Sequence, residues 1–298
     1  MHWGEIAALA TAVCWSMTAV FFSYSGRLIG SDVVNRSRLV FAFLFLSVTH
    51  LIIEGSLFPW DAEPYRWFWL ILSAILGLVL GDSFLFRAYV MIGPRLSMLL
   101  MSTVPIYSVL FGWLLFEEAI TAVEMAGILL AVGGIGWVVT ERRPGQTAVQ
   151  NKQYKKGILF GLAGALGQVT NLVTARYGLV GGYSTISATV IRILVALLIL
   201  WGVAALQRQI RYTLRMWGNR KAFRALIGGT ITGPFLGIWF SLIAIQSTRL
   251  GIAATLMALP PILLIPIEYV VYKRKVSQRG IVGTVVAIVG VALIFLPQ

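Results

Sequence analysis

The sequence predicts an all-α integral membrane protein in which ten transmembrane helices form two inverted five-helix repeats. Its composition, the spacing of its apolar runs and an internal duplication support this prediction. Hydrophobic residues make up 58% of the 298-residue chain, charged residues only 12%, and the mean hydropathy is +0.86. A soluble domain carries roughly 25% charged residues. The chain is therefore too apolar to cover a water-facing surface, and we expect the lipid bilayer to surround it.

Glycines, prolines and charged clusters divide the chain into apolar runs, each close to the ~20 residues that a membrane span requires. The runs of the first half are 4–24, 32–53, 66–91, 95–116 and 121–140. Those of the second half are 157–175, 184–206, 222–246, 251–272 and 278–297. This spacing predicts a first repeat at 1–140, a linker at 141–156 and a second repeat at 157–298.

The two halves align with each other, which indicates a duplication. From about Arg66 onward the alignment needs no gap at an offset of 156 residues, and nearer the start the offset is 153 to 154. Aligned pairs include Gly77 with Gly233, Pro105 with Pro261, Gly127 with Gly283, Gly134 with Gly290, and Arg38 with Arg192. Because five crossings are an odd number, the second repeat begins on the opposite face of the membrane. Inverted repeats of this kind are typical of secondary transporters.

The basic residues predict the orientation. The net charge is +13 and the pI about 10.3, a balance that also fits nucleic-acid binding. However, all but four of the 24 lysines and arginines lie in short segments on one side of the predicted membrane, the exceptions being Arg66, Arg176, Arg192 and Arg249. Basic loops stay in the cytoplasm. We therefore expect a multi-pass protein of the cell inner membrane with a cytoplasmic linker, both termini in the periplasm and no nucleic-acid partner.

Within that basic side, residues 207–224 space three arginines along one helical stripe opposite an apolar one. The pattern fits a helix on the anionic inner leaflet or an irregular basic loop.

Signals of catalysis and of metal or cofactor binding are missing from the sequence. The single cysteine, Cys14, excludes an internal disulfide and a cysteine metal cluster. The two histidines, His2 and His50, are not spaced as metal ligands, and no metalloprotease, phosphate-loop or nucleophile-elbow motif occurs. We therefore expect no enzyme activity, no metal and no cofactor.

An ordered set of weak motifs occurs twice. The first copy reads Ala88-Tyr89-Val90-Met91-Ile92-Gly93-Pro94, then Pro105, Phe116-Glu117-Glu118-Ala119-Ile120-Thr121, Gly127 and Gly134. The second copy repeats it through Ala244, Pro261, Val276-Ser277, Gly283 and Gly290. Together with Trp15-Ser16, Arg38 and Arg192, the set resembles the EamA-type repeat of the drug/metabolite transporter superfamily.

This resemblance covers the whole chain, with departures. Glu117 stands where the family has glycine, and Arg274 stands where the second copy should match Glu118. Many members also start in the cytoplasm, whereas the charges here predict the reverse. The resemblance implies a ten-helix exporter, with aromatic amino-acid exporters as the type considered. It also implies a central cavity lined mainly by helices one, three, four, six, eight and nine.

Polar and aromatic residues at membrane depth are the candidates for this cavity. A carboxylate such as Asp82 costs about 2.5–3.5 kcal/mol near a helix centre, so it either binds a substrate amine or proton or pairs with Arg87, Arg36 or Arg38. Glu268 lies close to Lys273 and Arg274, and we expect it to be a structural ion pair.

Gln168 and Asn171 share a helical stripe and either line the cavity or bond between helices. Arg192 meets a substrate carboxylate, or it snorkels or bonds backbone carbonyls. Thr18 aligns with Asn171, and Trp15 with Gln168, as positions where the copies differ.

Aromatic and proline residues complete the candidates. Trp15, Tyr107 and Trp239 either stack on a flat substrate or simply pack. Pro105, Pro260 and Pro261 fall in the fourth and ninth spans, where proline removes a backbone hydrogen bond. Such positions form hinges for alternating access or shape a static bundle.

These observations predict a secondary-type transporter that exports small metabolites, amino acids first and aromatic ones included, by alternating access at the repeat interface. A carrier of nucleotide sugars or phosphorylated metabolites needs several cavity-facing basic residues, and efflux of lipophilic cations needs a deep unpaired acid. A membrane enzyme or scaffold is the alternative from another class. The sequence leaves open the substrate, the energy coupling and whether the protein is a monomer or a homodimer.

Overall fold

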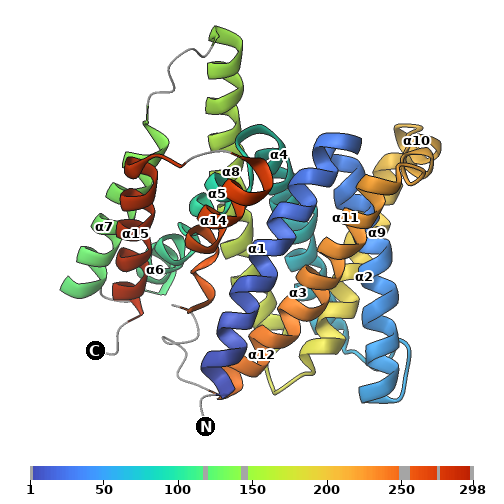
Figure 1. The fold of residues 1–298 in the computed structure, drawn as a ribbon. Helices are drawn as coiled ribbons and strands as arrows, with labels where there is room; N and C mark the ends of the chain where they lie inside the picture. Colours follow the sequence, from blue (N-terminus) through green and yellow to red (C-terminus); the bar gives the residue numbers. More distant parts are fainter. Residues whose placement is uncertain (1–2, 117–119, 142–146, 248–255, 274–275, 296–298) are drawn as a thin grey trace.

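In the computed structural model the chain folds as a bundle of α-helices (Figure 1). The structure describes residues 3–116, 120–141, 147–247, 256–273 and 276–295, and these contain no strand. The helices of the first half are α1 (Trp3–Ile29), α2 (Ser31–Glu54), α3 (Pro64–Ser73), the π-helical segment η1 (Ala74–Gly81), α4 (Asp82–Ile92), α5 (Pro94–Met101), α6 (Val104–Phe116) and α7 (Ala122–Val139). Those of the second half are α8 (Ala148–Gly178), α9 (Thr185–Leu206), α10 (Ile210–Met216), α11 (Arg220–Thr230), the π-helical segment η2 (Ile231–Gly237), α12 (Ile238–Ser247), α14 (Pro260–Tyr272) and α15 (Gln278–Ile294).

The helices confirm the predicted fold class. Across the described ranges, seven helices are long and apolar enough to cross a membrane, and 260–270 and 278–294 form shorter apolar helices. Each of the ten predicted spans coincides with a helix or a series of consecutive helices, although the start of the ninth and the end of the tenth lie outside the described residues. Large apolar side chains point outward around the bundle, with Leu129 65% and Leu198 60% exposed. Such a surface suits lipid rather than water.

One boundary differs clearly from the prediction. The helix α8 begins at Ala148, inside the predicted linker, and not at residue 157. The Thr147 backbone N–H donates to Oε1 of Gln150 (3.0 Å), and the Gln150 N–H donates to Oγ1 of Thr147 (3.3 Å). This reciprocal cap stabilises a polar helical start that hydropathy does not detect.

Both repeats carry a π-helical segment at the same place. The offset of 156 residues that aligns the repeats places η1 on η2, and each segment contains two of the aligned glycines. A π-helical stretch is rare and often marks a functional position. Here it widens the third and eighth spans where they cross the sixth and first.

Both repeats also carry a break in a membrane-spanning segment. A turn at Ser102–Thr103 separates α5 from α6, and a non-helical step at Ala258–Leu259 precedes α14. The same offset aligns these two breaks. Pro105 is the second residue of α6, and Pro260 and Pro261 are the first two of α14. The prolines therefore start the second half-helices, where a missing N–H costs least, and do not interrupt a helix from within.

The packing of α7 against α15 shows that the repeats are inverted. A Cβ at Gly134 would lie 2.6 Å from the carbonyl oxygen of Gly283, and a Cβ at Gly127 would lie 2.7 Å from that of Gly290. Gly134 thus contacts the residue that aligns with Gly127, and Gly127 contacts the residue that aligns with Gly134. The two helices are therefore antiparallel and related by a two-fold axis. Figure 1 shows α7 and α15 side by side, and α8 running opposite to α1.

Candidate functional site: a buried polar network

A buried ion pair joins the second and third spans. Asp82 is the first residue of α4, directly after η1, and is 5% exposed. Its Oδ2 accepts a hydrogen bond from Nη2 of Arg38 on α2. Arg38 also donates through Nε to Oδ1 of Asn35 (3.1 Å) and lies over the ring of Phe86. Of the three partners that the sequence offered for Asp82, the structure places Arg38 against it.

Two amides of α8 extend this pair into the second repeat. Nε2 of Gln168 donates to Oδ1 of Asp82 (3.1 Å), and Nδ2 of Asn171 donates to Oε1 of Gln168 (3.0 Å). Asn171 is almost completely buried. The two amides thus connect the carboxylate to the side chains around the sixth span.

The network ends at Arg192 on α9. Nη2 of Arg192 donates to Oδ1 of Asn171 (2.7 Å), which also accepts from the hydroxyl of Ser73 on α3 (2.6 Å). Arg192 is only partly buried, but its Nε is shielded from solvent and has no hydrogen-bond partner among the described residues. One strong donor of a guanidinium group is therefore unsatisfied, which is costly in a low-dielectric interior.

The charges of the network do not balance. Two guanidinium groups, those of Arg38 and Arg192, face the single carboxylate of Asp82, and that carboxylate bonds to Arg38 directly. Arg192 bonds instead to the neutral amide of Asn171. The end of the network at Arg192 is therefore electropositive and suits an anionic group, because guanidinium donors match the geometry of a carboxylate.

Glycines bring the helices of the network together. A Cβ at Gly77 would lie 2.5 Å from Cγ of Asn171, and a Cβ at Gly167 would lie 2.6 Å from the Cα of Gly81. Only glycine allows this approach of α8 to η1. The pairing of small residues across membrane helices follows the general rule, and here it presses Asn171 against the third span.

The first repeat's α1 crosses η2 in the equivalent way. A Cβ at Gly233 would lie 2.7 Å from Thr18, and a Cβ at Gly237 would lie 2.7 Å from Nε1 of Trp15. Thr18 shares a hydrogen bond with Thr232 (2.8 Å). Thr18 and Trp15 therefore occupy the symmetry-related crossing, apart from the network around Asp82.

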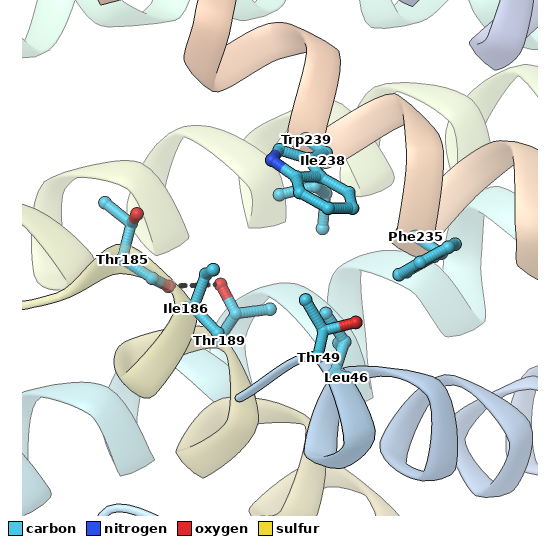
Figure 2. Close-up of a pocket in the computed structure, with 8 residues that line it drawn as sticks. All are labelled: Leu46, Thr49, Thr185, Ile186, Thr189, Phe235, Ile238 and Trp239. Atoms are coloured by element: carbon cyan, nitrogen blue, oxygen red, sulfur yellow. Dashed lines mark hydrogen bonds between the residues drawn. The ribbon is translucent and has the colours of Figure 1, made fainter. Parts of the chain in front are cut away.

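Trp239 belongs to a third location. It lines a cavity of about 20 Å³ between α2, α9 and the eighth span, together with Thr49, Thr189 and Phe235. Figure 2 shows its indole facing Thr185 and Thr189 across this space, where the Thr189 hydroxyl bonds the Thr185 carbonyl (2.7 Å). The cavity has room for about one water molecule. Tyr107 lies half-buried on α6, so the structure does not bring the predicted aromatic residues into one group.

Sequence reasoning missed two members of the network, Asn35 and Ser73. Arg38 was offered both as one of three partners for Asp82 and as a family residue, and the structure confirms the pair. The alignment of Arg38 with Arg192 singles out these two residues, because it places an arginine at equivalent positions of the two repeats. Asn35 and Ser73 carried no such signal.

A second ion pair joins the repeats at the end of the bundle that carries the linker. Glu268 bonds to Nε of Arg95 (3.2 Å), and Arg95 also donates to the Gly280 carbonyl (3.3 Å). Arg274, one of the neighbours expected for Glu268, lies outside the described residues. In the described ranges no cluster of three or more His, Cys, Asp or Glu is placed to hold a metal ion.

The chain is similar to known proteins in both its sequence and its fold. The model of the EamA-like transporter family matches residues 2–140 and again residues 155–296. A solved structure described as "Crystal structure of protein" matches 97% of this chain and 95% of its own, at 20% identity and a TM-score of 0.63. That likeness shows the fold alone. No curated protein matches significantly.

Proposed function

Because the chain belongs to the EamA-like transporter family, whose members are multi-pass membrane transporters, we propose that it exports small metabolites that carry a carboxylate, amino acids first and aromatic ones included. The observation that carries this proposal is Arg192, a guanidinium group whose Nε is unsatisfied and to which no acid of the described residues is bonded. A substrate carboxylate would supply the missing acceptor and the missing negative charge.

The same network argues against the other substrate classes. Efflux of lipophilic cations needs an acid that is free to meet them, and the carboxylate of Asp82 already bonds Arg38 and Gln168. A nucleotide sugar or a phosphorylated metabolite carries two or more negative charges. The excess charge of the network is that of one guanidinium group, which matches one carboxylate.

Alternating access at the repeat interface fits the symmetric irregularities of the bundle. In the part of each repeat that the structure describes, one π-helical segment and one broken span lie at aligned positions. Transporters with inverted repeats use such discontinuous helices near the midplane. We propose that Ser102–Thr103 and Ala258–Leu259 are the hinges, with Pro105, Pro260 and Pro261 fixing the start of the half-helix beyond each.

We further propose the orientation that the charges predict, with the linker in the cytoplasm and both termini in the periplasm of an inner membrane. Lys152, Lys155 and Lys156 lie in the first turns of α8, within the predicted linker at 141–156. Basic segments of this kind remain cytoplasmic.

Flux in proteoliposomes tests this function. Purified protein is reconstituted, and the exchange of a panel of radiolabelled amino acids is compared with that of protein-free vesicles. We expect exchange of at least one member that is lost in Arg192→Ala. Absence of flux for every member, from protein that elutes as a folded species, would contradict the amino-acid assignment.

A further inference from the structure

A second cavity, separate from Arg192, lies at the end of the bundle where α2 begins. Its volume is about 270 Å³, and it is bounded by α2, by the junction of η1 and α4, and by the end of α9 with the residues that follow. Its polar end is formed by Asp32, Arg36, Arg87, Gln207 and Gln209. Its apolar walls are formed by Val79, Leu80, Phe84, Leu200 and Val203.

The polar end carries an excess positive charge. Arg87 pairs with Asp32 (3.4 Å), so these two charges compensate each other. Arg36 is 5% exposed and donates through Nη2 only to the neutral Gln209 (3.1 Å), while its Nε has no hydrogen-bond partner among the described residues. A buried guanidinium group with an unsatisfied donor favours an anionic partner, because charge-assisted hydrogen bonds are the stronger ones.

The cavity has a fixed polar floor. Asn35 is 1% exposed and donates to the hydroxyl of Ser83 (3.1 Å), and its own oxygen accepts from Arg38. The floor therefore rests on the ion-pair network and holds Asn35 and Ser83 in place beside Arg36.

Two tryptophans place the polar end at the membrane surface. Nε1 of Trp201 donates to the carbonyl of Arg36 (3.0 Å), and Nε1 of Trp217 donates to the hydroxyl of Ser37 (2.8 Å). Tryptophan is enriched at the level of the lipid headgroups. The apolar walls lead from this level toward the membrane interior, and Leu80 and Val203 are 45% and 42% exposed on the outside of the bundle.

We propose that this cavity binds a phosphate group, and that the phosphate belongs to an anionic phospholipid of the adjoining leaflet. The phosphate oxygens bond Arg36, for which a bidentate acceptor is the best match. The first part of an acyl chain lies along Leu80 and Val203. A free phosphate has the same polar chemistry, but it makes no use of the apolar walls. Basic pockets between membrane helices bind lipid headgroups in this way.

Native mass spectrometry of the full chain in detergent tests this site. The retention of phosphatidylglycerol is compared with that of phosphatidylcholine with identical acyl chains. We expect preferential binding of phosphatidylglycerol, and Arg36→Gln should weaken it about tenfold or more, the effect of losing one charge-assisted contact. Arg215→Gln, an exposed arginine of α10, is the matched control and should bind as the wild type does.

A second variant keeps the test decisive if Arg36→Gln fails to fold. Val203→Trp fills the apolar half of the cavity with every charge intact, and it should lower phosphatidylglycerol retention as well. Equal retention of the two lipids by the wild type would overturn the proposal, as would full retention in a folded cavity variant. If excess inorganic phosphate displaces the bound lipid completely, a free phosphate is the ligand and the lipid assignment is wrong.

Discussion

Arg38 and Arg192 stand at aligned positions of the two repeats and are joined to each other by one chain of hydrogen bonds. Arg38 bonds the carboxylate of Asp82, and Arg192 bonds the amide of Asn171, with Gln168 between them. The duplication thus supplied two arginines, and only the first repeat supplied an acid. Substrate binding is proposed at the arginine that lacks one.

Cancelling the excess charge should strongly reduce transport without unfolding the protein. Asn171→Asp is isosteric and places a carboxylate within hydrogen-bond distance of Arg192, so a substrate carboxylate would be repelled. We expect exchange to fall about tenfold to a hundredfold, the range for losing a hydrogen bond to a charged group. Asn219→Asp is the control, because aspartate caps α11 as well as asparagine does. Undiminished exchange in folded Asn171→Asp would remove Arg192 from the binding site.

Substitutions of Arg38 and Asp82 should have strongly coupled effects on stability, because the two side chains form a buried ion pair. Asp82→Asn leaves a buried guanidinium group without its counter-ion, which costs about 3–5 kcal/mol. The double variant Arg38→Met, Asp82→Asn removes both charges, and its loss should be well below the sum of the losses in Asp82→Asn and Arg38→Met alone. The midpoint of thermal unfolding in detergent measures each variant. Losses that simply add in the double variant would show that the two side chains do not interact.

Alanine substitutions at the glycines of α7 should have opposite effects on stability, depending on whether the glycine faces α15. Gly134→Ala would place a Cβ 2.6 Å from backbone atoms of α15, and overpacking of this kind costs about 1–3 kcal/mol. Gly133→Ala, next to it in sequence, meets no heavy atom within 4 Å and gains helix propensity. We expect a lower Tm for the first variant and an unchanged or higher Tm for the second. The same Tm for both would contradict the α7–α15 packing.

Reporter fusions test the proposed orientation. A reporter that is active only in the cytoplasm should be silent when fused after Gln298 and active when inserted in the linker at 142–146. Because the assignment rests on the distribution of lysine and arginine, the reverse pattern would mean that features other than loop charge set the topology.

Much of the fold was predictable because each membrane span appears in the sequence as a long apolar run. The repeat alignment then located the glycines that meet between α7 and α15. The start of α8 at Ala148 was not predictable from hydropathy, since its first turns are polar and are stabilised by the cap at Thr147. The π-helical segments leave no mark in the apolar pattern, because they change the hydrogen-bond register and not the composition.

The candidate site was predictable where burying a polar or charged side chain in the bilayer costs free energy. Asp82, Gln168, Asn171 and Arg192 stand out for that reason, and the structure joins them in one network. Their partners depend on how each helix is rotated about its axis, which the sequence does not specify. Trp15 and the other aromatic residues tolerate both lipid and protein surroundings, so their depth alone did not indicate where they lie.

The central claim, that Arg192 binds the carboxylate of the transported metabolite, is tested most directly by competition with matched analogues. Phenethylamine lacks the carboxylate of phenylalanine, and phenylpropionate lacks its amine. Each is added to proteoliposomes that exchange the best labelled amino acid of the panel. The account predicts that phenylpropionate inhibits exchange and phenethylamine does not, and that Arg192→Lys weakens this inhibition because lysine lacks the planar fork of donors. Inhibition by phenethylamine alone would contradict it.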